Sequence, residues 1–264
     1  MKIFLFIFFT IAMGSKLCAQ TIDTVDLEKY FGEYTGTFVL FDKSGNKIFK
    51  FNPQRAAGRF IPASTFKIPN SLIGLETGVI PDENYVIPWD SVKRDFESWN
   101  RDHDLRSAIK YSVVPYYQEL ARRVGDERMK EYIRKIGYGN MDISGGIDMF
   151  WLTGALSISA NEQIEFLKRF YENKLPFSPR TVNIVKDILI KEKTDKYIFS
   201  AKTGTATVES NGKEKYIAWY VGYVEQNNNI YYFAMNFDAY DFKKLYDDRV
   251  DITKKVLNHF GLML

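Results

Sequence analysis

Two hydrophobic patterns divide the chain, and together they predict strands near both ends with helices between them. Short alternating or continuous hydrophobic segments, rich in Phe, Tyr, Val and Ile, are typical of strands. Five such segments occur: 36–41, 48–51, 197–208, 216–224 and 230–237. Clusters of Gly, Asn, Ser and Asp separate them at 42–46, 209–212 and 226–229, which predicts hairpin turns.

Elsewhere the hydrophobic residues recur three and four positions apart, the spacing of helices. This spacing predicts helices over 62–78, 103–136, 161–171, 179–191 and 245–260. Pro115 and Gly125 interrupt the second helix, whereas Pro69 falls in the first turns of the first, where a missing amide costs least. We expect Ser159 or Asn161 to cap the third helix.

The order of these elements predicts an α+β fold in a single domain. One antiparallel sheet would be built from both chain ends, 20–62 and 193–264, and flanked by the N- and C-terminal helices. A mostly helical insert over 63–192 would interrupt it. Residues 80–100 and the Gly-rich 137–155 are expected to be loops.

The first 19 residues differ from the rest of the chain and predict an export signal. A basic start, Met1-Lys2, is followed by an apolar run from Ile3 to Met13 and then by small residues up to Ala19. We expect cleavage after Ala19 and a periplasmic catalytic domain over 20–264. The alternatives are a buried N-terminal helix and lipid attachment at Cys18. No later run is long enough to span a membrane.

Composition excludes several kinds of site. Without residues 1–19 the chain has 34 basic residues against 33 acidic ones, which is no footprint for nucleic acid. One Cys excludes a disulfide scaffold. The only histidines, His103 and His259, lie far apart, so a metal cluster and a Ser-His-Asp triad are both improbable. A serine enzyme of this sequence needs a different base.

The pattern Ser-x-x-Lys offers a lysine as that base. It occurs four times, beginning at Ser44, Ser64, Ser107 and Ser210. Those at 44 and 210 fall in predicted turns, where Ser is a turn former and the Lys is solvated. The one at 107 lies in a polar helical stretch and favours a solvated face. Only Ser64 and Lys67 stand among apolar residues, Phe60 to Pro69.

Positions i and i+3 share a helix face, so Lys67 can reach Ser64 at the helix N-terminus, where the dipole favours a developing oxyanion. Apolar surroundings lower the pKa of a lysine. Neutral Lys67 could act as a base directly, or could add CO2 and become a carbamate with a carboxylate-like head. The plain alternative is that Ser64 caps the helix and Lys67 reaches water.

Three further segments could complete such a site. On a predicted strand edge, Lys202-Thr203-Gly204 could hold a substrate carboxylate, or could be an ordinary strand with a bulge. In Ser112-Val113-Val114 the Ser could relay a proton, or could cap the bend before Pro115. Taken alone, Tyr138-Gly139-Asn140 and Trp151 are typical turn and core residues.

In order and spacing, these segments together resemble the class D (oxacillinase-type) serine β-lactamases over nearly the whole mature chain. The matching motifs are Ser64-Thr65-Phe66-Lys67, Ser112-Val113-Val114, Tyr138-Gly139-Asn140, Trp151-Leu152 and Lys202-Thr203-Gly204. The resemblance implies the serine β-lactamase/penicillin-binding transpeptidase fold. It also implies hydrolysis of penicillin-type β-lactam antibiotics, and hence antibiotic resistance.

The resemblance further implies a role for each residue. Ser64 is the acylated nucleophile, and Lys67 is N-carboxylated (N6-carboxylysine) and serves as general base. Trp151 donates its indole N–H to the carbamate, while Ser112 shuttles protons with Lys202. The remaining residues hold the substrate or the site: the amides of Ser64 and Thr205 as oxyanion hole, Thr203, Gly204 and Arg249 around the substrate carboxylate, and Val114 and Leu152 as an apolar gate.

No cofactor and no metal are expected beyond the CO2 that carboxylates Lys67. The partners would be β-lactams, with the protein a monomer or homodimer. One departure is Ala218, which stands before Trp219 where the family usually has Gly. The alignment of Arg249, in Asp247-Asp248-Arg249-Val250, crosses variable hairpins.

Other functions fit parts of the pattern. A penicillin sensor of the same fold would stay acylated, but would need a membrane-spanning domain. A D-alanyl-D-alanine peptidase or class A-like enzyme would use a carboxylate base on a separate loop, for which residues 172–176 (ENKLP) are a near match. A secreted carbohydrate-binding domain could use the surplus aromatic residues. Substrate range is expected to depend on the loops around 89–105 and 207–216.

Overall fold

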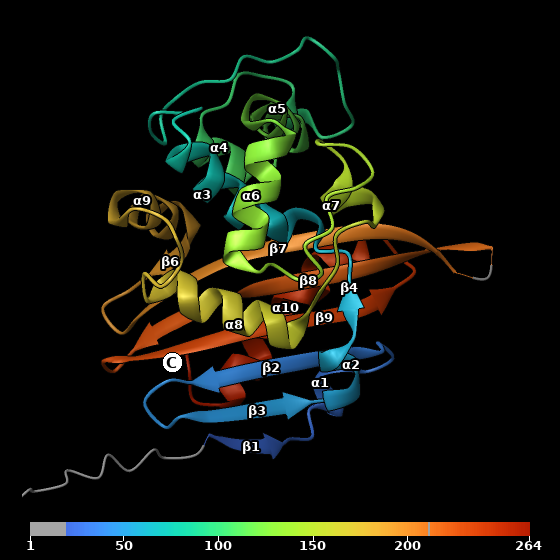
Figure 1. The fold of residues 1–264 in the computed structure, drawn as a ribbon. Coiled ribbons are helices and arrows are strands. Elements are labelled where there is room, and N and C mark those ends of the chain that lie inside the picture. Colours follow the sequence, from blue (N-terminus) through green and yellow to red (C-terminus); the bar gives the residue numbers. More distant parts are fainter. Residues whose placement is uncertain (1–19, 211) are drawn as a thin grey trace, which may run out of the picture.

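The computed structural model describes residues 20–210 and 212–264. The proposed signal peptide and Cys18 lie outside the described residues. A seven-stranded sheet in the order β1-β3-β2-β9-β8-β7-β6 runs through the molecule (Figure 1). The strands are β1 (Thr21–Thr24), β2 (Gly36–Asp42), β3 (Lys47–Phe51), β6 (Ile190–Lys193), β7 (Tyr197–Ser210), β8 (Lys213–Gln226) and β9 (Asn229–Ala239).

The predicted strands are all present, and the sheet is mainly antiparallel, as expected. One pair differs: β1 runs parallel to β3, with Thr21 opposite Lys47. A short edge strand of four mostly exposed residues carries too little hydrophobic pattern to be found in the sequence. The two-stranded pair β4 (Arg59–Phe60) and β5 (Ile158–Ser159) is likewise too short to be predicted from the sequence.

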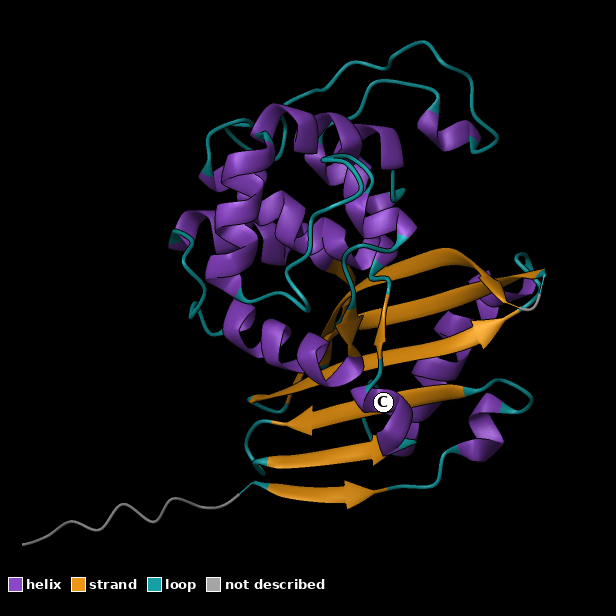
Figure 2. Ribbon diagram, turned by 45° about the vertical axis from the view of Figure 1, so that its right-hand side comes forward, coloured by secondary structure: helices purple, strands orange, loops and turns teal. Residues whose placement is uncertain are grey.

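Helices cover both faces of the sheet, as Figures 1 and 2 show. On one face α10 (Lys244–His259) packs with α1 (Glu28–Phe31). The other face carries the helical layer: α2 (Pro53–Ala57), η1 (Ala63–Phe66), α3 (Lys67–Glu76), η2 (Glu97–Trp99), α4 (Leu105–Lys110), α5 (Val114–Val124), α6 (Asp126–Ile136), α7 (Phe150–Thr153), α8 (Ala160–Tyr171) and α9 (Pro179–Leu189).

Successive side chains of a strand point to opposite faces, and β8 divides between two cores in this way. Trp219 and Val221 belong to the core under the helical layer, whereas Ala218 and Tyr220 belong to the core under α10. Residues of both faces are buried, so the sheet is covered on both sides. Among the described residues, no helix has both the length and the apolar character to cross a membrane.

The helix boundaries have local causes. Ser159 caps α8 through a capping box, accepting from the Glu162 N–H while Glu162 accepts from Ser159. The helical stretch is interrupted near Pro115 as expected: Pro115 is the second residue of α5, a first-turn position that needs no amide. α9 ends at Leu189 because residues 190–193 leave it to form β6. The loop expected over 137–155 contains the short helix α7, whose four residues are too few to give a periodic pattern.

Candidate active site

Ser64 and Lys67 meet where η1 passes into α3. Ser64 lies in η1, and Lys67 is the first residue of α3. The Lys67 Nζ donates a hydrogen bond of 2.6 Å to the Ser64 Oγ. Ser64 is half-buried whereas Lys67 is fully buried. An amine is therefore held against a hydroxyl that solvent and a substrate can still reach.

Aromatic rings surround the Lys67 amine. Its Nζ lies 5.3 Å from the centre of the Tyr117 ring, and the adjacent Phe66 stacks on Trp151 at 5.4 Å. Burial lowers the pKa of Lys67 from 10.5 to about 7, because an apolar environment disfavours the charged ammonium. Near neutral pH a large share of this amine is unprotonated and can act as a base or a nucleophile.

Trp151 is fully buried on α7, and its indole N–H has no hydrogen-bond partner among the described residues. A buried donor without a partner is rare, and it is a place where a missing acceptor is expected. The segment that carries Trp151 is held by Asn140, whose Nδ2 donates to the Ala155 carbonyl and whose Oδ1 accepts from the Ser157 N–H. Gly139 precedes it at a φ of 55°, and a Cβ there would lie 2.1 Å from the Ser157 carbonyl.

Ser112 and Lys202 form a second serine–lysine pair, brought together from positions 90 residues apart. The Lys202 Nζ donates to the Ser112 Oγ at 3.0 Å and to the Thr203 carbonyl at 2.9 Å. Ser112 takes a left-handed φ of 56° in the turn between α4 and α5. Burial and then the charge of Lys67 hold the pKa of Lys202 well below its ordinary value.

Residues 203–205 form a stretch of strand edge beside Ser64 that has no neighbouring strand on one side. The ladder between β6 and β7 ends at Ser200, which leaves the following residues of β7 unpaired on that side. Gly204 packs against η1, where a Cβ would lie 2.9 Å from the Pro62 carbonyl and 3.2 Å from the Thr65 nitrogen. Only glycine allows strand and serine to approach so closely.

Arg249 reaches the same edge from α10. Its Nη1 donates to the Thr205 Oγ1 at 2.7 Å and to the Gly204 carbonyl at 3.2 Å. The guanidinium lies 4.4 Å from the centre of the Tyr246 ring, and its Nε is buried without a partner. An incompletely paired guanidinium at the edge of a cleft is suited to binding a carboxylate.

These residues border one cleft of about 350 Å³. Eight residues named from the sequence line it: Ser64, Ser112, Val114, Leu152, Thr203, Gly204, Thr205 and Arg249. Lys67, Trp151 and Lys202 do not line it and lie buried beneath it. Ala218, opposite Thr205 in the ladder, turns its side chain into the core under α10, so this departure from the family pattern does not touch the cleft.

Seven lining residues were not named from the sequence: Phe96, Trp99, Lys110, Tyr111, Thr207, Phe242 and Tyr246. Phe96, Trp99 and Thr207 do fall in the two loops expected to shape substrate range. Lys110, interpreted as a residue of a solvated face, is exposed but faces the cleft. For Phe242 and Tyr246 the sequence does hold a sign of a binding role, because they are large aromatic residues among polar ones at the start of a predicted helix.

The carboxylate considered as an alternative base lies elsewhere. Glu172 follows α8 and forms ion pairs with Lys43 at 3.2 Å and Lys174 at 2.6 Å. It is absent from the lining of the cleft. Within 20–210 and 212–264, no three His, Cys, Asp or Glu side chains are grouped so as to hold a metal ion.

Comparison with known proteins agrees with this geometry. The family model of the penicillin binding protein transpeptidase domain matches residues 36–258. The chain is 50% identical over 203 residues to β-lactamase OXA-48 of Klebsiella pneumoniae, covering 77% of this chain and 75% of that protein. It is 41% identical over 266 residues to β-lactamase OXA-19 of Pseudomonas aeruginosa, covering 100% of this chain and 99% of that protein.

Solved structures give the same result. The class D β-lactamase YbXI from Nostoc superposes with a TM-score of 0.86 at 42% identity, covering 90% of this chain and 100% of that one. The class D β-lactamase from Sebaldella termitidis superposes with a TM-score of 0.87 at 38% identity, covering 92% of this chain and 99% of that one. The chain belongs to the class D serine β-lactamases, a family of hydrolases with the penicillin-binding transpeptidase fold.

Proposed function

We propose that this protein hydrolyses the amide of penicillin-type β-lactams through an acyl-enzyme on Ser64, with carboxylated Lys67 as general base, and so confers antibiotic resistance. One observation carries the proposal: a fully buried amine lies 2.6 Å from the hydroxyl of a serine that opens into a cleft. Members of this family act without a metal ion, and the described residues group no metal ligands.

Acylation begins when the proton of the Ser64 hydroxyl passes to the base at Lys67 and the Oγ attacks the β-lactam carbonyl carbon. The backbone N–H groups of Ser64 and Thr205, two residues that line the cleft, would stabilise the oxyanion. As the ring C–N bond breaks, the leaving nitrogen takes a proton from Ser112, which Lys202 replenishes through their 3.0 Å hydrogen bond. The proton held by the base at Lys67 then passes through solvent to Lys202, so both groups return to their starting state before deacylation.

Deacylation uses water as the nucleophile, and Ser64 becomes the leaving group. The base at Lys67 takes a proton from water, the hydroxide attacks the ester carbon, and the Ser64 oxygen leaves with a proton. One base serves both half-reactions. Loss of Lys67 should therefore slow acylation and nearly stop deacylation, trapping the acyl-enzyme.

The residues around Lys67 fit a carbamate. A carbamate there supplies a carboxylate-like base, and it forms only on a neutral amine, which the lowered pKa of Lys67 provides. The unpartnered indole N–H of buried Trp151 would gain an acceptor. Val114 and Leu152 line the cleft above and would keep water from the group.

The substrate carboxylate is assigned to Thr203 and Arg249. Thr203 lines the cleft beside Gly204, and Arg249 donates to the Thr205 hydroxyl from the opposite side of the strand edge. These groups meet the substrate equally in its ground and transition states. We therefore expect them to contribute to binding and less to the chemical step.

Labelling of the full mature chain with a penicillin tests the proposal. The native enzyme should turn over a chromogenic β-lactam continuously, Ser64→Ala should show neither turnover nor label, and Lys67→Ala should retain a stable label by mass spectrometry. Ser44→Ala, a serine of the same four-residue pattern in a turn, is the matched control and should behave as the native enzyme. A label on Ser107 would overturn the site, and a single-turnover burst would indicate a penicillin sensor or D-alanyl-D-alanine peptidase instead.

We propose from residues 1–19 that the protein is exported. Their basic start and apolar run support export to the periplasm, where β-lactams meet their targets. Amino-terminal sequencing of the secreted protein tests it, and a start at Gln20 is the expected result. A protein that retains Met1 would contradict the proposal.

A further inference from the structure

A second hollow, separate from Ser64 and Lys67, lies between the loop of residues 87–103 and the start of α5. Its volume is about 260 Å³. Trp99 lines both this hollow, which we call the loop hollow, and the active-site cleft, whereas Trp89 lines only the loop hollow. None of the residues proposed for catalysis borders it.

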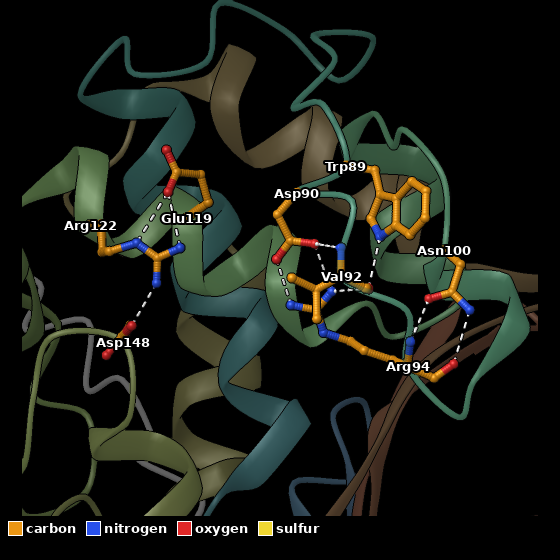
Figure 3. Close-up of polar contacts among 8 residues, drawn as sticks. All are labelled: Trp89, Asp90, Val92, Arg94, Asn100, Glu119, Arg122 and Asp148. Atoms are coloured by element: carbon orange, nitrogen blue, oxygen red, sulfur yellow. Dashed lines mark hydrogen bonds and ion pairs between the residues drawn. The ribbon is translucent and has the colours of Figure 1, made fainter.

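Hydrogen bonds within the loop fix the wall of the loop hollow (Figure 3). The Trp89 N–H donates to the Asp102 carboxylate at 2.8 Å, and the Trp89 indole donates to the Val92 carbonyl at 3.1 Å. Asn100 accepts from the Arg94 N–H at 2.8 Å and donates to the Arg94 carbonyl at 2.9 Å. A loop tied in this way presents its hollow ready formed, so a ligand need not order the wall on binding.

The floor of the loop hollow is apolar and partly aromatic. Ile87, Val113 and Tyr116 are buried there beside the equally buried His103, and Trp89 and Trp99 also line the hollow. Small-molecule sites typically combine such a lining with a few polar groups that orient the ligand. A single aromatic ring matches this floor.

The charges at the rim are neutralised, with one exception. Arg122 donates to Glu119 and pairs with Asp148 at 2.6 Å (Figure 3). Glu119 also accepts from Arg123. Asp90 pairs with Arg94.

The exception is Arg101, which has no carboxylate within ion-pair distance in the part of the chain that the structure describes. Its guanidinium lies 5.0 Å from the centre of the exposed Tyr111 ring. Tyr111 borders the active-site cleft and not the loop hollow, whereas Arg101 itself lines the loop hollow, so Arg101 is an exposed cation at the rim between the two.

We propose that the loop hollow binds a small aromatic carboxylate, with the ring on the floor and the carboxylate against Arg101. Ring and anion are both required: the floor alone offers no charge, and Arg101 alone is an ordinary surface cation. A one-ring ligand has few atoms, so we expect a dissociation constant on the order of 1 mM.

The chain provides its own reporters, because it has only four tryptophans. In ¹⁵N-labelled mature protein, the four indole N–H signals can be assigned with Trp→Phe variants. Titration with benzoate should shift the Trp89 and Trp99 signals together and saturably, while Trp219, buried in the core, stays in place. A ligand in the active-site cleft would shift Trp99 without Trp89.

Three variants and one neutral probe test the assignment. Arg101→Gln should weaken benzoate binding about fivefold or more, and benzamide, which lacks the charge, should bind the native protein weaker by a similar factor. Lys93→Gln removes an equal charge from the same loop outside the hollow, and Arg249→Ala removes the cation of the active-site cleft. Both should leave the Trp89 titration unchanged.

Three results would overturn the proposal. They are an absence of saturable Trp89 shifts, an affinity that Arg101→Gln leaves within twofold of native, and a titration that disappears in Arg249→Ala. The last would place the ligand in the active-site cleft.

Discussion

Replacing Trp151 with Phe separates the proposed carbamate from an ordinary core role of the indole. The substitution keeps an aromatic ring against Phe66, on which Trp151 stacks at 5.4 Å, and removes only the smaller ring with its N–H. In the unmodified protein this buried N–H has no partner among the described residues. If Lys67 carries a carbamate, the same N–H gains a charged acceptor.

A hydrogen bond to a charged group contributes about 1.5–3 kcal/mol. Its loss should raise the bicarbonate concentration needed for half-maximal activity by about 10- to 150-fold, since 1.4 kcal/mol corresponds to a factor of ten. The free energy of unfolding without bicarbonate should change little. The smaller ring buries less apolar area, which destabilises the protein, but the substitution also removes a buried donor that has no partner, which stabilises it. The two measurements therefore respond differently.

The assay is β-lactam hydrolysis in CO2-depleted buffer, titrated with bicarbonate, beside chemical unfolding of the same samples. Trp219→Phe is the matched control: Trp219 is as deeply buried, but its indole donates to the Ile61 carbonyl at 2.9 Å. That variant should lose about 1–3 kcal/mol more stability than Trp151→Phe and keep the native bicarbonate requirement. A half-maximal bicarbonate concentration for Trp151→Phe within twofold of native would refute the reasoning.

Three further predictions concern the same cleft. Because burial lowers the pKa of Lys67 to about 7, its neutral fraction falls roughly tenfold per pH unit below that. At a fixed, subsaturating bicarbonate concentration, where the carbamate forms from the neutral amine without releasing a net proton, the hydrolysis rate should drop about 50-fold from pH 7 to pH 5 and level off above pH 8. A rise that continues to pH 10 would contradict the shift. Gly204→Ala places a Cβ 2.9 Å from the Pro62 carbonyl and should lower kcat about 100-fold by moving the strand edge from Ser64; native kcat in steady-state assays would disprove the contact. Arg249→Ala should raise KM with little change in kcat, and a loss confined to kcat would assign it to transition-state stabilisation.

Local sequence determines the elements of this fold well. The two-residue alternation in β8 places Trp219 and Tyr220 in opposite cores, as the strand geometry requires. Ser64 and Lys67 stand three residues apart in a helical stretch, so their contact follows from helix geometry alone. Elements with too few residues for a pattern, such as β1 and α7, were missed.

Only tertiary structure decides how the distant parts of the site converge. Ser112 and Lys202 meet at 3.0 Å because the turn before α5 abuts a strand 90 residues later, and hydrophobic periodicity names a buried face without naming its partner. The pKa of Lys67 likewise depends on burial beneath rings from other segments, Tyr117 and Trp151 among them. The sequence supplies the reactive groups. Packing of the helical layer on the sheet sets the distances between them and their protonation states. Distance and protonation state both depend on what surrounds a side chain in space and not on its neighbours along the chain.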